Sequence, residues 1–340
     1  MERRQVIVIG AGPSGSIASA LLRRRNRDVL VLERQQFPRF SIGESLLAHC
    51  LDFVEEAGMM PAVEAAGFQY KNGAAFCRGD RYADFDFAEK STKGRDSTFQ
   101  VQRAAFDKLL ADEAERQGVE IRYQQEIVAV DFSTRPRVTV RDATGESRDI
   151  EGEFVLDASG FGRTLPKLLA LERPSAFPVR NAVFTHVADG IPAGAFDRDK
   201  IRVTIHPDHK DVWYWLIPFA GGRSSLGVVA QQEFFAAYSR NSTERLRAIV
   251  AEDPGLSGLL AQADWDTPAR ELGGYAANVT TMHGRGFALL GNAAEFLDPV
   301  FSSGVTIAMR SASMAVACLD RQLAGERIDW EQEFARPLRR

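Results

Sequence analysis

The chain opens with an alternation of short apolar runs and one small-residue helix pattern. Residues 5–9 form a β-branched run, residues 14–22 are small and apolar enough for a closely packed helix, and residues 29–32 form a second apolar run. Apolar runs of strand length without polar alternation are typical of strands buried on both faces. The pattern therefore predicts a βαβ unit at the N-terminus, with two parallel strands joined by a helix.

The middle of the chain mixes helix and strand patterns. Apolar residues recur at helical spacing over residues 44–57, which predicts a helix there. Residues 71–87 have the pattern of strands, and a strand over residues 99–103 leads into a helix over residues 104–117. Further strands are predicted at residues 126–132, 137–140 and 154–156.

Between about residues 176 and 274 the pattern changes to alternating strands, which predicts an antiparallel sheet forming a second domain. A buried strand at residues 287–290 and a helix at residues 304–323 then return to the first pattern. Within the second domain we expect strands at residues 202–205, 212–217 and 225–229 and a helix at residues 243–251.

Composition narrows the class of protein. The 340 residues are 45% hydrophobic and 26% charged, as in an ordinary globular protein with one large or two joined domains. The net charge of −4 comes from interspersed signs, so nucleic acid is not an expected partner, and no stretch approaches a membrane span. Cys50, Cys77 and Cys318 lie far apart without disulfide or zinc spacing, so we expect a reducing, cytoplasmic location.

One cluster of metal-ligating residue types has a simpler explanation. His206, Asp208, His209 and Asp211 surround Pro207 between two predicted strands. Such a group is typical of a polar hairpin turn, and its residues do not have the spacing of a zinc site. We therefore predict no metal site.

The segment Gly10-Ala11-Gly12-Pro13-Ser14-Gly15 follows the first predicted strand and opens the first helix. In that context, the first glycine permits a tight turn, the second lets the backbone approach a pyrophosphate, and the third allows close packing of helix on strand. The phosphate charge then faces a helix N-terminus. The motif predicts a dinucleotide site.

A carboxylate supports the dinucleotide site, and two further segments favour FAD over NAD, although the βαβ unit alone is compatible with either. Glu33 ends the second strand 18 residues after Gly15 (33 − 15), where a carboxylate accepts hydrogen bonds from ribose hydroxyls. Val101-Gln102-Arg103 places a cation where the phosphate or adenosine region of a flavin cofactor lies. Asp157-Ala158-Ser159-Gly160 is a strand end followed by a tight turn.

Four segments carry the motifs of one family. They are Phe37-Pro38-Arg39-Phe40-Ser41-Ile42-Gly43-Glu44-Ser45-Leu46, a WxWxIP motif at Trp213-Tyr214-Trp215-Leu216-Ile217-Pro218, an FxxPxxSxG motif at Phe296-Leu297-Asp298-Pro299-Val300-Phe301-Ser302-Ser303-Gly304, and a KxG motif at Lys71-Asn72-Gly73. Over nearly its whole length the chain resembles the flavin-dependent halogenases of phenol and pyrrole type, within the p-hydroxybenzoate-hydroxylase-like flavoproteins.

The resemblance implies an α/β fold, with a Rossmann-like FAD-binding domain of the glutathione-reductase type and an inserted antiparallel-sheet substrate domain. We place the FAD-binding domain at residues 1–70, 95–175 and 275–325 and the substrate domain at residues 71–94 and 176–274. Residues 326–340 would begin a C-terminal helical region, which is either compact here or trimmed, since relatives usually continue further.

The resemblance also implies an FADH2-dependent aryl halogenase of secondary metabolism. In the family, a separate flavin reductase supplies reduced flavin, O2 converts it to a hydroperoxide, chloride or bromide attacks the hydroperoxide, and hypohalous acid travels to a lysine. That lysine is Lys71 here, and apolar neighbours such as Phe68 and Phe76 would make its amine easier to deprotonate. The implied roles of Trp213 and Trp215 are to line the path and keep substrate from the hydroperoxide.

The residues expected to bind FAD and halide follow from the motifs. The amides of Ser303 and Gly304 precede an apolar helix, which makes them the expected halide site. Asn292 stands where relatives often carry aspartate and still accepts a hydrogen bond from a flavin hydroxyl. The expected cofactor-binding residues are Gly10, Gly12, Pro13, Ser14, Gly15, Glu33, Arg34, Ser41, Ile42, Gly43, Arg103, Ser159, Gly160, Asn292, Pro299, Ser303 and Gly304.

One departure from the family bears on the substrate. Tryptophan-type members carry a glutamate within FxxPxxSxG where this chain has Phe301. We therefore expect a small aromatic substrate that is already activated, a phenol or a pyrrole, either free or tethered to a carrier protein. Two alternatives stay open: a non-halogenating oxidoreductase of the same fold, such as a geranylgeranyl-reductase-like reductase or an aromatic hydroxylase, and a flavin-binding regulator without its own turnover.

Overall fold

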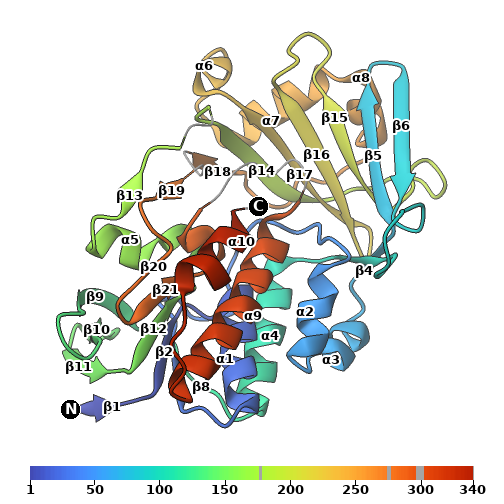
Figure 1. Cartoon of the computed structure of the whole chain (residues 1–340). Helices are drawn as coiled ribbons and strands as arrows, with labels where there is room; N and C mark the ends of the chain where they lie inside the picture. Colours follow the sequence, from blue (N-terminus) through green and yellow to red (C-terminus); the bar gives the residue numbers. More distant parts are fainter. Residues whose placement is uncertain (176–177, 274–276, 296–301, 340) are drawn as a thin grey trace.

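The chain folds around two large sheets, shown in Figure 1 for the computed structural model. The structure describes residues 1–175, 178–273, 277–295 and 302–339. The predicted βαβ unit is present as β2 (Val6–Ile9), α1 (Pro13–Arg24) and β3 (Val29–Leu32), and its two strands pair in parallel. The predicted α/β fold is therefore confirmed.

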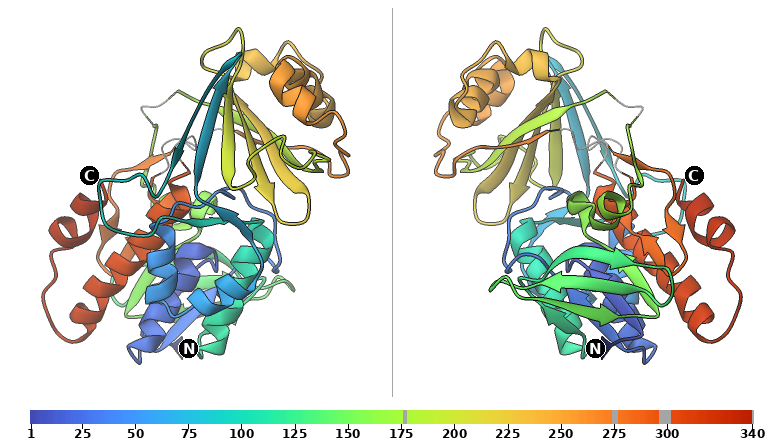
Figure 2. Two further views of the ribbon diagram at one scale, coloured as in Figure 1. Left: turned by 90° about the vertical axis from the view of Figure 1, so that its right-hand side faces the viewer. Right: turned by 90° about the vertical axis from the view of Figure 1, so that its left-hand side faces the viewer.

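The first sheet has six strands in the order β20-β21-β12-β2-β3-β8, which are parallel except for β20. Every residue of β2, β3 and β12 is buried, as their continuous apolar runs predict. Helices α1, α4 and α9 cover one face, and the sheet β1-β11-β10-β9 lies on the other (Figure 2). The additional elements are α4 (Arg103–Arg116), β8 (Glu120–Arg122), β12 (Phe154–Asp157), β20 (His283–Gly284), β21 (Phe287–Leu289), α9 (Gly304–Leu323), β1 (Glu2–Arg3), β9 (Glu126–Asp131), β10 (Arg137–Arg141) and β11 (Ser147–Glu151).

The second sheet has seven strands in the order β18-β14-β17-β16-β15-β5-β6, antiparallel except for the pair β5 and β15. One face carries Tyr214 and Leu216, which pack with apolar residues of helices α7 and α8. The opposite face carries Trp213 and Trp215 and looks toward the first sheet. The elements are β5 (Gly73–Arg78), β6 (Arg81–Asp86), β14 (Asn181–Ala188), β15 (Lys200–Ile205), β16 (Trp213–Phe219), β17 (Arg223–Ala230), α6 (Gln232–Phe235), α7 (Ser242–Ala251), α8 (Pro254–Leu259) and β18 (Arg270–Gly273).

The predicted helix over residues 44–57 is wrong in its first half, because α2 begins only at Cys50. Residues 44–46 are instead extended beside residues 99–101. The Leu46 amide donates to the Phe99 carbonyl at 3.1 Å, and the Val101 amide donates to the Glu44 carbonyl at 2.7 Å. The pairing satisfies backbone groups that a helix would otherwise satisfy internally. Strand β11 had not been predicted.

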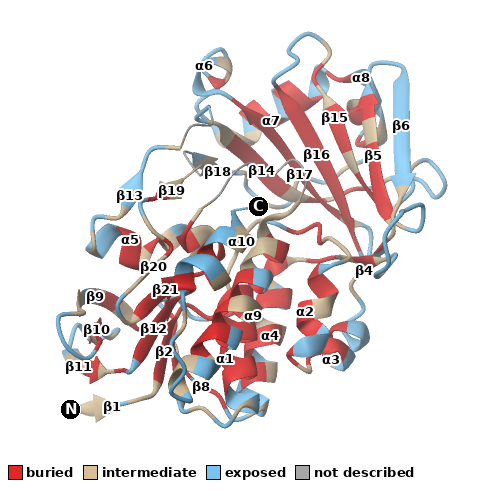
Figure 3. Cartoon of the chain, viewed as in Figure 1, coloured by how far each residue is buried: buried red, intermediate tan, exposed pale blue. Residues whose placement is uncertain are grey.

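Burial follows the two sheets, whereas β6 is an exposed edge strand (Figure 3). The domain boundaries given above remain a prediction. Across the described ranges, we find no helix with the length and apolar character that a lipid bilayer would require. The remaining elements are α2 (Cys50–Glu56), α3 (Met60–Ala65), β4 (Gln69–Lys71), β7 (Thr98–Gln100), η1 (Gly160–Gly162), α5 (Thr164–Leu168), β13 (Glu172–Arg173), β19 (Asn278–Val279), η2 (Gly291–Ala293), the π-helix η4 (Glu331–Ala335) and α10 (Arg336–Leu338).

Candidate functional site

A cavity of about 560 Å³ lies between the loop after β2 and the inner face of the large sheet. Its volume is within the usual range for a small-molecule or cofactor site. Trp213 and Trp215 line it, whereas Lys71, Gly15 and Ser303 do not, and Pro299 lies outside the described residues. The expected cofactor-binding residues that line it are Gly10, Gly12, Pro13, Ser14, Glu33, Arg34, Ser41, Ile42, Gly43, Arg103, Ser159, Gly160, Asn292 and Gly304.

The glycine loop closes one end of the cavity. Gly10 has a φ of +95°, which favours glycine, and a Cβ on Gly15 would lie 1.9 Å from the Gly10 carbonyl oxygen. Gly15 therefore packs helix against loop rather than facing the cavity. Gly12 precedes α1 without a side-chain cap, so the first-turn amides of this helix have no side-chain acceptor. Amides presented in this way fit an anionic pyrophosphate.

Glu33 is fixed by the same loop. Its carboxylate accepts hydrogen bonds from the backbone amides of Ala11 and Gln35, both at 2.8 Å, and the residue is 6% exposed. A carboxylate has about four lone-pair positions, so two remain for other donors. The arrangement fits ribose hydroxyls, and the assignment of Glu33 to the ribose stays a prediction.

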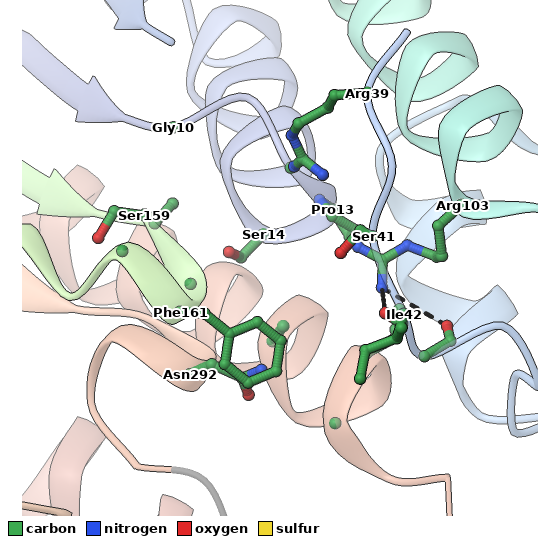
Figure 4. A pocket seen from close by; sticks show the side chains of 18 of the residues that line it. Gly10, Pro13, Ser14, Arg39, Ser41, Ile42, Arg103, Ser159, Phe161 and Asn292 are labelled. Atoms are coloured by element: carbon green, nitrogen blue, oxygen red, sulfur yellow. Dashed lines mark hydrogen bonds between the residues drawn. The ribbon is translucent and has the colours of Figure 1, made fainter. Parts of the chain in front are cut away.

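Two arginines share one buried carboxylate beside the loop. Arg103 donates to both oxygens of Asp107, at 2.7 and 3.0 Å, and to the Ile42 carbonyl at 2.6 Å (Figure 4). Arg39 lies 3.2 Å from the same carboxylate, and its guanidinium would be 3.2 Å from a Cβ on Gly12. Arg103 is thus committed to holding residues 42–43, and Arg39 is the cation nearest the second glycine. Sequence reasoning missed Arg39, although it stands inside the quoted family segment.

The middle of the cavity is formed by the turn after β12 and by η2. The Asp157 carboxylate accepts from the amides of Ser159 at 2.9 Å and Leu165 at 2.7 Å, which shapes the turn. Burial raises the pKa of Asp157. Figure 4 shows the Phe161 ring beside Asn292, both at the cavity. Phe161 was another lining residue that the sequence analysis did not identify.

The indole of Trp215 is positioned by the neighbouring strand β17. Its Nε1 donates to the Ser225 hydroxyl at 3.0 Å. Gly227 lies directly under the ring, since a Cβ there would be 2.3 Å from the indole. The Trp213 and Trp215 rings lie 6.0 Å apart between centroids. Both rings stand on the cavity wall, and their role in guiding substrate remains a prediction.

Helix α9 begins at the cavity with Gly304, preceded by Ser303 as N-cap. Within the described residues no side chain caps this end, so its first-turn amides have no side-chain acceptor there. Such an end attracts an anion, which fits the expected halide. Most of the FxxPxxSxG motif, including Phe301, lies outside the described residues. The halide assignment to Ser303 and Gly304 therefore stays a prediction.

Lys71 is buried, with 1% of its surface exposed. Its Nζ donates to the Leu46 carbonyl at 2.7 Å and lies 5.2 Å from the centre of the Phe87 ring. Burial lowers the pKa of this amine from 10.5 to about 7. The amine is therefore desolvated as expected, but Phe87 is the ring that it faces. The Lys71 amine lies behind the cavity wall. Of the residues that line the cavity, Ser45 is the one nearest to Lys71 in sequence.

The predicted polar turn connects β15 to β16. His206 is buried, its Nε2 pairs with Glu252 at 2.9 Å, and its Nδ1 accepts from the amides of Asp208 and His209. One ring nitrogen is thus engaged within the turn and the other with Glu252, at the end of α7. Searching the described part of the chain for a group of three metal-ligating side chains finds none.

Comparison with known proteins gives the site a family. The FAD binding domain family matches residues 3–332. Tryptophan 2-halogenase of Chondromyces crocatus is 32% identical over 95% of this chain and 62% of its own length. The 1H-pyrrole-2-carbonyl-[peptidyl-carrier protein] chlorinase of Pseudomonas fluorescens is 30% identical over 91% of this chain and 74% of its own length. The chain thus spans less than two thirds of the first relative.

Two solved structures resemble the fold closely. A flavoprotein/dehydrogenase from Cytophaga hutchinsonii superposes with a TM-score of 0.95 at 41% identity, covering 99% of this chain and 82% of that one. The myxobacterial chondrochloren halogenase superposes with a TM-score of 0.90 at 30% identity, covering 100% of this chain and 80% of that one. The chain therefore belongs to the FAD binding domain family and, within it, to the flavin-dependent halogenases.

Proposed function

We propose that this chain is an FADH2-dependent aryl halogenase that acts on an electron-rich phenol or pyrrole with chloride or bromide. The observation that carries the proposal is Lys71, a buried amine with a pKa of about 7 behind the wall of the cofactor cavity. At neutral pH an ordinary lysine is charged, whereas burial lowers the pKa of this one toward neutrality and favours its uncharged form. Either form can bind hypohalous acid, as an N–H donor or as a nucleophile.

The remaining residues have separate roles in this proposal. Reduced FAD, when bound, would supply the two electrons that bring O2 to the peroxide level, and this peroxide-level oxygen would oxidise halide to hypohalous acid. The amides at the start of α9, at Ser303 and Gly304, hold the halide. Trp213 and Trp215 exclude water and keep the aromatic substrate at a distance from the cofactor. Lys71 holds the oxidised halogen for transfer to the ring.

Substrate and partners follow from the same chemistry. An activated ring is proposed because Phe301 replaces the glutamate that tryptophan-type members carry, and that position lies outside the described residues. Two relatives, a chlorinase and a brominase, are named for a pyrrole carried by a peptidyl-carrier protein. A carrier-bound acyl pyrrole is therefore the tethered form of the substrate to test. A separate flavin reductase is the proposed source of reduced FAD.

The experiment combines the protein with a flavin reductase, NADH, chloride or bromide, and a panel of phenols and pyrroles, free and carrier-bound. Halogenated product is detected by its mass shift. We expect Lys71→Ala to lose about 100-fold or more of this product, the scale of a lost catalytic group, with FAD affinity nearly unchanged. Lys200→Ala is the matched control. Lys200 is also buried, but its amine donates to the Asp197 carboxylate at 2.8 Å, and the residue does not line the cavity. Full halogenation by Lys71→Ala would reject the role of this lysine.

A second candidate function is a non-halogenating FAD-dependent oxidoreductase. Two observations favour it: Lys71 does not line the cavity, and the Cytophaga hutchinsonii protein is a flavoprotein/dehydrogenase at 41% identity. In this case Lys71 is a structural residue inherited with the fold. Turnover of reduced flavin with an organic substrate, without a halide-containing product anywhere in the panel, would favour this second function.

A further inference from the structure

Three buried polar groups near Lys71 have no hydrogen-bond partner among the residues that the structure describes. They are the Ser45 hydroxyl, the Thr98 hydroxyl and the Gln100 side-chain carbonyl. The three residues are 3%, 1% and 1% exposed. Buried polar groups without partners are rare in folded proteins because each one loses its bonds to water. A cluster of them therefore indicates a site that a small polar molecule fills.

Strand register places these groups on one face. Lys71 pairs with Thr98, Gln69 pairs with Gln100, and Ser45 forms a bridge with Gln100, all antiparallel. Directly opposed residues project to the same side of a sheet, as do residues two apart on one strand. The amine of Lys71 and the three unpartnered groups thus project from the same side of a three-stranded arrangement.

The donors and acceptors of this niche, defined as Ser45, Lys71, Thr98 and Gln100, are complementary. The Gln100 Nε2 donates to the Arg198 carbonyl at 3.0 Å, so the amide is fixed and its oxygen is left as an acceptor. Lys71 donates one N–H to Leu46, which leaves two N–H groups on the ammonium or one on the neutral amine. The hydroxyls of Thr98 and Ser45 can donate or accept. The niche matches a molecule with one O–H donor and one acceptor oxygen.

Ser45 connects the niche with the cofactor cavity. It lines the cavity, and its hydroxyl is one of the three unpartnered groups. Ile201 and Ile217, at the ends of β15 and β16, line the same cavity. Gln100 is held by the Arg198 carbonyl, three residues before Ile201. The niche therefore begins at a residue of the cavity wall.

We propose that Ser45, Thr98 and Gln100 are positioning residues that bind hypohalous acid beside Lys71. The proposal rests on the proposed function, because only halide oxidation supplies this molecule. Hypohalous acid is water with one hydrogen replaced by halogen, so it keeps one O–H donor and an acceptor oxygen. In this proposal hypohalous acid binds with its O–H toward Gln100 and its oxygen toward the Lys71 amine.

The test measures how oxidised halogen divides between product and solution. Halogenated product and hypohalous acid trapped by monochlorodimedone are both counted per flavin oxidised. We expect Thr98→Val and Gln100→Leu to lower the ratio of product to trapped acid about tenfold, which corresponds to ~1.4 kcal/mol of lost binding. Thr98→Ser, which keeps the hydroxyl, restores the ratio. The rate of flavin oxidation should not change, whereas a merely structural role would lower it.

Gln117→Leu is the matched control for Gln100→Leu. Gln117 also has an unpartnered side-chain oxygen, and its Nε2 donates to the Ala57 carbonyl at 3.0 Å, but it caps α4 far from the niche. An unchanged ratio in Thr98→Val and Gln100→Leu would show that the niche holds water only and overturn the proposal. If the natural sequence forms neither halogenated product nor trapped acid, the proposed function fails first, and the niche loses its ligand with it.

Discussion

Replacing Lys71 by methionine tests whether this amine loses its proton on folding. Burial lowers its pKa from 10.5 to about 7, and the residue is 1% exposed. One pKa unit corresponds to about 1.4 kcal/mol, so holding the proton in the folded state costs about 4–5 kcal/mol relative to the unfolded chain. Methionine has a similar length and no charge, so it removes this cost.

The sign of the pH dependence follows from proton counts. Between pH 7 and 10.5 the unfolded chain keeps the Lys71 proton and the folded protein releases it, so stability rises with pH in that window. From pH 7.5 to 9.5 the free energy of unfolding of the natural sequence should gain about 2–3 kcal/mol relative to Lys71→Met. The Leu46 carbonyl loses its donor in the variant, but that loss is independent of pH.

The assay is urea unfolding of both proteins at several pH values and one fixed FAD concentration, since FAD binding also contributes to stability. Lys200→Met is the control. A hydrogen bond from Lys200 to Asp197 raises the pKa of this lysine, so it stays charged in both states up to pH 9.5 and should add no slope. If the free energy of unfolding changed with pH in the same way for the natural sequence and for Lys71→Met, the prediction that burial lowers the pKa of this amine would be refuted.

Four further substitutions test how the cavity is built. Gly15→Ala would place a methyl group 1.9 Å from a loop carbonyl oxygen and should prevent folding. Gly12→Ala would meet only the end of an arginine side chain at 3.2 Å, so this variant should fold but bind FAD about tenfold more weakly. Equal losses of Tm in the two variants would contradict this prediction. Gly227→Ala would place a methyl group 2.3 Å from the Trp215 indole, so it should shift tryptophan fluorescence and lower product per flavin oxidised; an unchanged emission spectrum would contradict it. Asp107→Asn weakens the anchor of two cavity arginines, so fluorescence titration should show FAD affinity falling about tenfold, and unchanged affinity would argue against that anchor.

The sequence predicts best those features that depend on neighbouring residues. The βαβ unit and the loop with Gly10 and Gly15 follow from apolar runs and glycine spacing within about 30 residues. The predicted strands of the large sheet and helix α9 are also present. These elements bury their apolar faces in the way that their periodicity requires, so local pattern and tertiary packing agree.

The features that the sequence did not predict depend on pairing between distant segments. Residues 44–49 have helical spacing but no helix, because Ser45 pairs with Gln100. The support of Trp215 comes from Ser225 and Gly227 on another strand. Arg39 gains its position from Asp107, which lies 68 residues away (107 − 39) on α4. No local pattern encodes such contacts.

One short segment, residues 39–46, joins the cofactor cavity to the proposed halogenation site. Its first residue stands beside the glycine loop, Ile42 accepts from Arg103 at 2.6 Å, and the carbonyl of Leu46 accepts from Lys71 at 2.7 Å. Glu44 adds a contact of 2.8 Å with His186 on β14. These contacts share one stretch of backbone, whose first residue stands beside the glycine loop and whose last residue accepts the Lys71 hydrogen bond. The amine of Lys71 is therefore fixed by the same segment that lines the cofactor cavity, although the lysine itself lies outside the cavity.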